Sequence, residues 1–460
     1  MGKRFLASIF VICCIISISV SAFSAGFPDT YGFGIRAVSL GGAFTAVADD
    51  FSAAHYNPAG LAQITGHHLS IEYFYTSPDI DVKRLSGGDL YTTDIMGRKR
   101  TDPTEGTAGD GLDLQIPIIG IILDINKIVK LPMNVQLGIA ASLPEHMDIS
   151  YRIHDFPPDQ PHFIRYGDDI DRITMAISLG IEVIKDLIYV GGGTHSMLYG
   201  PGKYYIDDLS LAEENVVAQA ENGALLENDP IVGILITPFD KKLKIGLSWK
   251  HEQELKLGPM PISSSVFIGG SWELDIPMLL DINAFFCPEE YSAGIALDLD
   301  RFMVSIEADK QLWSEYSYST TDRYHYYPGA PGLSGYETGT PDFDDTINYR
   351  LGIEYRLNPS AEVMFGYCHQ PTPVPDQSGR VSNYLDMDKD IFSLGASYTF
   401  KDPTGIVKEP VKIAGVFQYQ MCDDITVNKN GVSGPSWDRQ ESYKIEGDVY
   451  AGGVSVTLSW

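Results

Sequence analysis

The sequence predicts a membrane-spanning antiparallel β-barrel of about 14 strands whose lumen is closed by an N-terminal plug. Three observations lead to this fold class. A secretory signal opens the chain, strict period-two alternation of apolar and polar residues fills most of the remaining sequence, and short turns alternate with long polar segments. A length of 460 residues would also suit two or three soluble domains, so length alone does not decide.

The N-terminus has the three parts of a signal peptide. Lys3 and Arg4 precede an apolar run over residues 5–20, and small residues follow before Ala25. The run is shorter than the roughly 20 residues that cross a bilayer as a helix. We therefore expect cleavage after Ser24; the alternative is an uncleaved anchor.

Net charge and cysteine content exclude several functions. With 33 basic and 61 acidic residues the formal charge is −28, which disfavours nucleic acid as a partner. Cys287, Cys368 and Cys422 show no metal-ligand or disulfide-framework spacing, so we expect no metal site and no cofactor. Two states of these cysteines remain possible: three buried thiols, or one disulfide and one free thiol. After the signal the chain has no apolar run long enough for a spanning helix, so any crossing must use strands.

Residues 25–60 predict the plug. Gly32, Gly34, Gly41 and Gly42 interrupt this stretch too often for a long helix or strand, and its many small residues allow backbone to pack closely against a surrounding wall.

Period-two alternation predicts the wall. In residues 172–182, Ile173, Met175 and Ile177 alternate with small or charged residues. The pattern recurs in residues 242–250, 291–299, 349–357, 391–400 and 453–460.

A soluble sandwich would explain any single strand, with the apolar face in its core. Aromatic residues at the strand ends favour a barrel instead, because membrane barrels carry aromatic girdles. Charges of both signs lie together on the polar faces, and we expect Arg350, Glu354 and Arg356 to form ion pairs in a wet lumen. The turns agree with this choice. Long polar segments are expected at residues 83–111, 200–230, 316–345, 371–389 and 422–443.

Three motifs in order then indicate a family. AGF at residue 25, LGGAFTAVADD at residue 40 and NPAG at residue 57 come after the signal, and this stretch resembles the N-terminal hatch of the FadL/TodX outer-membrane transport proteins. The last strand ends on Trp460, similar to the aromatic assembly signal of outer-membrane barrels, which more often ends in Phe. The resemblance implies a signal peptide at 1–24, a hatch at 25–66 and a barrel at 67–460.

The resemblance also implies roles for the hatch residues. Gly26 and Phe27 match the end that reaches into a binding pocket. Asp49 and Asp50 are expected to anchor the hatch to lumen cations, with Arg350 or Arg356 as partners. The residues expected to fix the shape of the hatch are Gly41, Gly42, Asn57, Pro58, Ala59 and Gly60.

A ligand site is expected near the long loops. Among acids in residues 207–228, the apolar residues Leu209, Leu211, Val216 and Val217 predict short amphipathic helices that line a groove; the alternative is a loop packed on its neighbours. A fatty acid carboxylate needs buried cations. Lys203 and Lys389 lie nearest the positions the family uses, although ordinary ion pairs are the alternative for both.

The expected function is passive uptake of long-chain fatty acids or other hydrophobic compounds, including aromatic hydrocarbons, by a monomer in outer-membrane lipid and lipopolysaccharide. No G-x-S-x-G elbow, phosphate loop or metal cluster appears in the sequence, so an enzyme is not expected. Two alternatives stay open: a barrel that serves secretion or surface attachment without transport, and a barrel lipid hydrolase.

Overall fold

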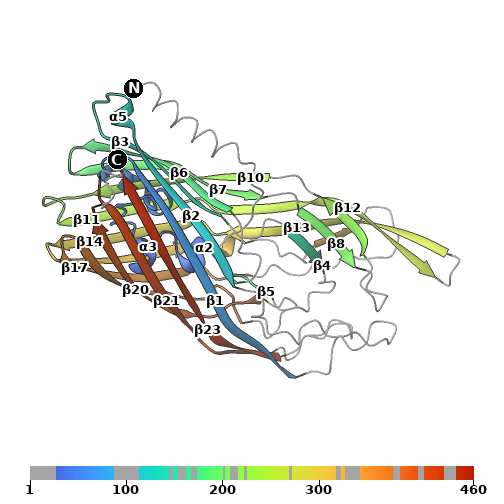
Figure 1. The fold of residues 1–460 in the computed structure, drawn as a ribbon. Coiled ribbons are helices and arrows are strands. Elements are labelled where there is room, and N and C mark those ends of the chain that lie inside the picture. The colour runs from blue at the N-terminus through green and yellow to red at the C-terminus, as the bar shows by residue number, and fades with distance from the viewer. Residues whose placement is uncertain are drawn as a thin grey trace.

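The computed structural model describes residues 27–86, 113–143, 149–153, 162–166, 173–199, 202–207, 216–221, 225–268, 272–316, 323–326, 342–376, 384–401, 409–428 and 442–460. In these residues fourteen antiparallel strands close into a barrel, because β1 pairs with both β2 and β23 (Figure 1). The predicted fold class and strand number are therefore confirmed.

The barrel strands run in chain order around the wall. They are β1 (His68–Ser86), β2 (Leu114–Asp124), β3 (Val135–Ser142), β6 (Ile173–Ile184), β7 (Ile188–Tyr199), β10 (Leu225–Ile236), β11 (Leu243–Lys250), β14 (Glu290–Leu299), β15 (Phe302–Gln311), β17 (Thr346–Asn358), β18 (Ala361–Gln370), β20 (Lys389–Phe400), β21 (Val411–Cys422) and β23 (Ser442–Ser459). Each of the six stretches predicted from alternation lies on one of these strands to within one residue at its ends, apart from residue 172, which lies outside the described residues.

Nine shorter or projecting strands lie outside the ring in the described residues. Two three-stranded sheets, the pair β5–β19 and the edge strand β22 account for them, and β12 and β13 project well beyond one end of the barrel (Figure 1). Their bounds are β4 (Ile149–Ile153), β5 (His162–Phe163), β8 (Gly202–Asp207), β9 (Val216–Glu221), β12 (Gln253–Ile268), β13 (Trp272–Cys287), β16 (Arg323–Tyr326), β19 (Tyr384–Leu385) and β22 (Ile425–Val427).

The segment 200–230 differs from the prediction of a polar loop with short helices. Its described parts are strands: β8, β9 and the start of β10, where Pro230 pairs with Thr194 of β7. Val216 and Val217 therefore lie on β9. For the start of β10, the physical reason is that β7 and β10 continue their antiparallel ladder past the apolar part of the wall, where a polar sequence no longer shows the alternation that marks a strand. β8 and β9 instead pair with each other, and β8 with β4, in a separate sheet.

The two faces of the wall are the reverse of those in a soluble sandwich. On β14, Ile295 and Leu297 are each 44% exposed, whereas Ser292 is buried. On β15, Ile306 is 54% exposed while the inward-facing Glu307 is buried. Apolar side chains thus cover the outside and polar side chains face the lumen, as expected for strands that lipid surrounds.

The N-terminal segment fills the lumen (Figure 1). It consists of short helices, α2 (Phe27–Tyr31), α3 (Ile35–Ser39) and α4 (Ala53–Tyr56), followed by the 3-10 helix η1 (Pro58–Gln63). Gly32 and Gly34 separate α2 from α3 with φ of 88° and 86°, a backbone conformation that favours glycine. Two further helices, α5 (Ile125–Ile128) and η4 (Trp313–Glu315), belong to turns of the wall.

None of the helices in the described part of the chain is long and apolar enough to cross a membrane.

A band of glycines on the inner wall gives the hatch its room, and we call it the glycine belt. On eleven strands a Cβ added to the glycine would approach a hatch atom, for example within 2.2 Å of the Pro58 carbonyl carbon at Gly191 and 2.0 Å of the Gly41 nitrogen at Gly366. The belt members are Gly120, Gly138, Gly180, Gly191, Gly233, Gly246, Gly294, Gly352, Gly366, Gly395 and Gly453. Several are cross-strand partners, such as Gly180 with Gly191 and Gly352 with Gly366, so they form a band at one level of the barrel.

Candidate functional site

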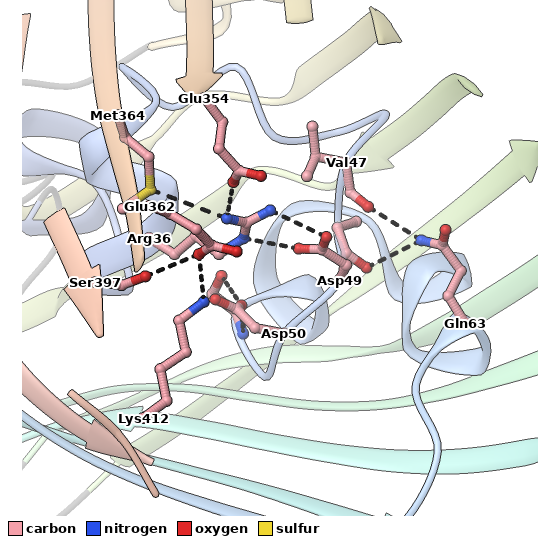
Figure 2. A network of polar contacts seen from close by, with 12 residues as sticks. Arg36, Val47, Asp49, Asp50, Gln63, Glu354, Glu362, Met364, Ser397 and Lys412 are labelled. Carbon is pink, nitrogen blue, oxygen red and sulfur yellow. Dashed lines mark hydrogen bonds and ion pairs between the residues drawn. The ribbon is translucent and has the colours of Figure 1, made fainter. Parts of the chain in front are cut away.

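A hydrogen-bonded ion network joins the hatch to the wall (Figure 2). Arg36 on α3 donates to both oxygens of Asp49, at 3.0 and 3.1 Å, and forms a second ion pair with Glu354 of β17. Figure 2 shows Lys412 of β21 beside it, paired with Glu362 at 2.9 Å. The guanidinium therefore crosslinks two segments of the hatch to the barrel, in the bidentate geometry that arginine favours.

This network corrects the expected anchor. In the described part of the chain, neither Asp49 nor Asp50 pairs with Arg350 or Arg356. Asp50 instead accepts hydrogen bonds from the backbone and hydroxyl of Ser52. Burial opposes ionisation of Asp49, but the charge of Arg36 outweighs it and lowers the pKa of that carboxyl to about 2. In this network the cation belongs to the hatch, and Glu354 of the wall supplies the acid.

Arg350 and Arg356 have other partners in the lumen. Arg350 forms an ion pair with Asp309 of β15 and donates to the Gly41 carbonyl at 3.1 Å. Arg356 binds Asp298 through both terminal nitrogens, at 2.7 and 2.9 Å.

The turn at the end of the hatch is held by the Asn57 side chain. Its amide nitrogen donates to the Thr45 carbonyl at 2.8 Å and to the Ile234 carbonyl of β10 at 3.2 Å, while its oxygen accepts from Ala59 at 3.1 Å. A Cβ at Gly60 would lie 2.1 Å from the Ala48 carbonyl oxygen. Backbone approach therefore requires glycine at this position. At Gly42 the nearest atom is the Arg350 side-chain nitrogen Nη1, 2.4 Å from an added Cβ, and the φ of 75° also favours glycine.

The first helix of the hatch lies in an aromatic cluster, which we define as Phe27, Tyr31, Phe74 and Tyr166. The Phe27 ring centroid is 5.6 Å from that of Tyr31 and 5.7 Å from that of Phe74, and Tyr31 is 6.4 Å from Tyr166. All four side chains are buried. The segment bearing Tyr166 also accepts a hydrogen bond from Thr30 of α2 at 3.2 Å, so α2 and this segment form one packed unit.

Two cations and one carboxylate adjoin the aromatic cluster; we call Arg165, Asp386 and Lys389 the cation site. Arg165 Nη1 is 2.7 Å from Asp386 Oδ2, and Lys389 Nζ is 3.5 Å from Asp386 Oδ1. Lys389 also lies over the Tyr166 ring, 4.5 Å from its centroid. The side chains of Asp386 and Lys389 are fully buried, and that of Arg165 is 3% exposed.

The charge of the cation site is not balanced within these three residues. Among the described residues, Lys389 Nζ, Arg165 Nη2 and Asp386 Oδ1 have no hydrogen-bond partner. Burying an ionised group without full pairing is expensive. The arrangement is therefore suited to an additional anionic group that would bind both cations.

A second aromatic cluster contacts the cation site through Arg165. The Arg165 guanidinium is 5.3 Å from the Trp313 ring, which packs against Phe343 at 6.3 Å and Phe286 at 6.1 Å. The cation site thus contacts two aromatic clusters, one through Lys389 and one through Arg165.

A small polar cavity lies on the opposite side of α2. It is lined by residues of the hatch and of β7, β11, β13 and β14 among others, including Asp29, His55, His195, Lys250 and Cys287. The Cys287 thiol donates to Asp29 at 2.7 Å, and burial lowers the pKa of His55 well below its usual range. A neutral imidazole and a protonated thiol make this a hydrogen-bonding site of the lumen, because a buried thiol is not the reactive thiolate.

The other predicted residues are not brought to the cation site. Gly26, Leu209 and Leu211 lie outside the described residues. Lys203 lies on β8, in the sheet β4-β8-β9, rather than on the barrel strand that begins at Lys389. All three described cysteines are free thiols. In the part of the chain that the structure describes, no group of His, Cys, Asp and Glu is arranged to hold a metal ion.

Sequence reasoning missed Arg165, Asp386 and Arg36. The i, i+3 spacing of Asp386 and Lys389 was an available signal for an ion pair. The pairing of Arg165 with Asp386 joins residues more than 200 positions apart, and no local pattern announces it.

A closed barrel with an apolar exterior, a polar lumen and a hatch clamped to the inner wall defines the class of hatch-plugged outer-membrane β-barrels. Within this class the chain has the fold of the FadL/TodX transport proteins, as the three N-terminal motifs predicted.

Comparisons with solved structures show this fold. The structure matches a FadL homologue of Pseudomonas aeruginosa with a TM-score of 0.57 and 16% identity, over 96% of this chain and 99% of that one. It matches the toluene transporter TodX of P. putida with a TM-score of 0.53 and 14% identity, over 94% and 99% of the two chains.

One curated relative resembles part of the sequence. Alkane uptake protein A of Marinobacter nauticus is 30% identical over 178 residues, which is 38% of this chain and 37% of that protein. The match thus spans less than half of the relative. No family model matches the sequence.

Proposed function

We propose that the protein is an outer-membrane channel for the passive uptake of long-chain fatty acids, with the ligand carboxylate held by Lys389 and Arg165. The observation that carries the proposal is the cation site: two buried cations share one carboxylate beside the aromatic cluster. A hydrocarbon chain can pack against aromatic rings while its carboxylate pairs with both cations, which offsets the desolvation of the charges.

The aromatic clusters support a route. Trp313, Phe286 and Phe343 form one cluster, which contacts Arg165. Phe27, Tyr31 and Tyr166 belong to another, which contacts Lys389. We propose that the ligand passes from the first group to the second, and that α2 moves to make room. Gly32 and Gly34, both with positive φ, are the candidate hinges, whereas Arg36 and the glycine belt hold the rest of the hatch. The movement must break the hydrogen bonds that the wall residues Gln370, Gln418 and Gln420 donate to the α2 carbonyls.

Pro117 of β2 supports a lateral exit. Its carbonyl accepts a hydrogen bond from Leu143, just after β3, at 2.8 Å, but a proline supplies no backbone donor to a ladder. We propose that a hydrophobic ligand leaves the lumen between β2 and β3 near Pro117, without entering water.

The test is displacement of a fluorescent fatty acid from detergent-purified protein by oleate and by toluene. We expect oleate to displace the probe. Lys389→Met should lower the affinity for oleate by more than tenfold and change the affinity for toluene by no more than about twofold, because truncating one partner of a buried charge pair costs about 2–5 kcal/mol. Lys310→Met is the matched control, since Lys310 is 52% exposed on the outer face. Equal loss for oleate and toluene would make Lys389 structural.

A second candidate is a channel for neutral hydrocarbons. The relatives favour it, because TodX is a toluene transporter and the curated relative is an alkane uptake protein. In this case toluene displaces the probe as well as oleate does, and Lys389→Met affects neither. A probe that does not bind at all would favour the alternative without transport, a secretion or surface-attachment partner.

The remaining expectations belong to the same proposal. They are cleavage of the signal peptide after Ser24, residence of a monomer in the outer membrane, and an extracellular surface that contacts lipopolysaccharide. The relatives are described as transporters rather than enzymes, which supports a transport role without catalysis.

A further inference from the structure

The turn between β2 and β3 exposes apolar side chains at the rim of the barrel. Ile128 is 52% exposed, Val129 53%, Leu131 38% and Met133 43%. The turn lies at the same end of the barrel as the short turn 185–187 and the C-terminal Trp460. Short turns mark the periplasmic end of an outer-membrane barrel. Four apolar side chains next to one another in a turn call for a partner.

The turn is rigid rather than frayed. The Asn126 side chain donates to the Met133 carbonyl at 2.8 Å and accepts from the Val135 amide at 2.8 Å, so it bridges both sides of the turn. Asp124 caps α5 through the Asn126 amide at 3.0 Å. Asn134 donates to the Ala62 carbonyl of the hatch at 2.8 Å. The exposed apolar tip is therefore presented in a fixed shape.

Charge and position indicate the kind of surface that covers it. Residues 125–134 contain Lys127 and Lys130 and no acidic residue, although the whole chain carries −28. The helix α5 of this turn lies at the edge of the barrel's outline, above β3 (Figure 1). On β6, the strand paired with β3, Val183 is 54% exposed on the outer face. The apolar tip is thus continuous with the surface that lipid surrounds.

We propose that this turn is a membrane foot, in which Ile128, Val129, Leu131 and Met133 insert into the periplasmic leaflet and Lys130 binds anionic phospholipid headgroups. Apolar side chains flanked by lysines are the chemistry of interfacial membrane segments. Lys127 stabilises the foot from the protein side, because its Nζ donates to the Trp460 carbonyl at 2.9 Å. A second exposed ring, Phe239 in the β10–β11 turn, is 75% exposed and lies beside Lys241.

The test places a fluorophore in the foot of the full chain in lipid nanodiscs. Val129→Cys is labelled with the environment-sensitive dye NBD, with Asn358→Cys in the polar β17–β18 turn as matched control and unmodified protein as background for the native thiols. The discs contain phosphatidylcholine with or without phosphatidylglycerol, and either lipid can carry a nitroxide quencher near its headgroup.

We expect blue-shifted emission at position 129, severalfold stronger nitroxide quenching there than at position 358, and a preference for quenching by phosphatidylglycerol. Lys130→Gln should reduce that preference by about fivefold, the factor that one lysine near an anionic membrane surface supplies. Quenching at 129 by aqueous iodide to the same extent as at 358, without nitroxide quenching, would overturn the proposal. Nitroxide quenching with no lipid preference would overturn the role of Lys130. A shift that requires an added periplasmic extract would point to a protein partner and would also overturn it.

Discussion

The glycine belt predicts that one methyl group on the inner wall loosens the hatch. At Gly191 an added Cβ would lie 2.2 Å from the Pro58 carbonyl carbon and 2.3 Å from the Ala59 nitrogen. Both are backbone atoms, so no side-chain rotation can relieve the overlap and the turn must move. Overpacking of this kind costs about 1–3 kcal/mol, which lowers the docking equilibrium of the turn by roughly 5- to 150-fold.

The neighbouring glycine supplies the control. A Cβ at Gly192 would meet its nearest atom at 3.5 Å, an ordinary contact, on the opposite face of the same strand. The assay is hydrogen exchange of hatch peptides covering residues 53–66 in Gly191→Ala and Gly192→Ala, each in detergent.

Gly191→Ala should exchange roughly 5- to 150-fold faster in that peptide, while the wall strands keep their protection. Gly192→Ala should match the parent protein. Equal exchange in the two variants, or faster exchange in the wall alone, would refute the idea that the belt gives the hatch its room.

Three further predictions concern the hatch. Deletion of residues 25–31 should weaken fatty acid binding in the displacement assay yet leave a heat-modifiable barrel on gels; unchanged affinity would remove Phe27 from the site. Asn57→Ala should destabilise the docked hatch by about 1–3 kcal/mol, seen as faster hydrogen exchange, because it removes the donor to the buried Thr45 carbonyl and the bond to the Ile234 carbonyl of the wall. The pKa of Asp49 is lowered to about 2 in the folded chain, compared with about 4 in the unfolded chain. The ionised carboxylate therefore stabilises the folded hatch fully above about pH 4, and this stabilisation is lost as the pH falls toward 2. Pepsin should therefore cut the hatch faster at pH 2 than at pH 4, and Asp49→Asn should be cut rapidly at both; a parent protein resistant at both pH values would contradict this.

The strands of the wall could be predicted because lipid forces a simple pattern on them. A strand with one face toward lipid and the other toward the lumen must alternate apolar and polar residues. The strands β6, β11, β14 and β17 lie where this alternation predicted them. Beyond the lipid this constraint ends. The ladder of β7 and β10 continues through Pro230 in a polar sequence that is typical of a loop. Val216 and Val217, which were expected on short helices, lie on the strand β9, and Leu209 and Leu211 lie outside the described residues.

The candidate site was only partly predictable, for a different physical reason. Lys389 was singled out by position, but its surroundings come from Arg165 and Asp386, whose contacts depend on how distant segments fold together. The predicted partners of the hatch anchor Asp49 were wrong for the same reason. Asp49 has a cation thirteen residues away on its own segment, and no rule of spacing selects Arg36 over Arg350 in an irregular chain.

Hatch and wall share a single volume at the belt, which makes their sequences interdependent. At Gly120 an added Cβ would lie 2.1 Å from the Phe51 ring, so a larger residue on the wall requires a smaller one in the hatch. At Gly366, where the facing atom is the Gly41 backbone, no such exchange exists. Positions like Gly120 should therefore tolerate a larger wall residue when the facing hatch residue becomes smaller, whereas positions like Gly366 should tolerate no substitution of either glycine. A hatch grafted from another barrel would fit only together with its own ring of glycines.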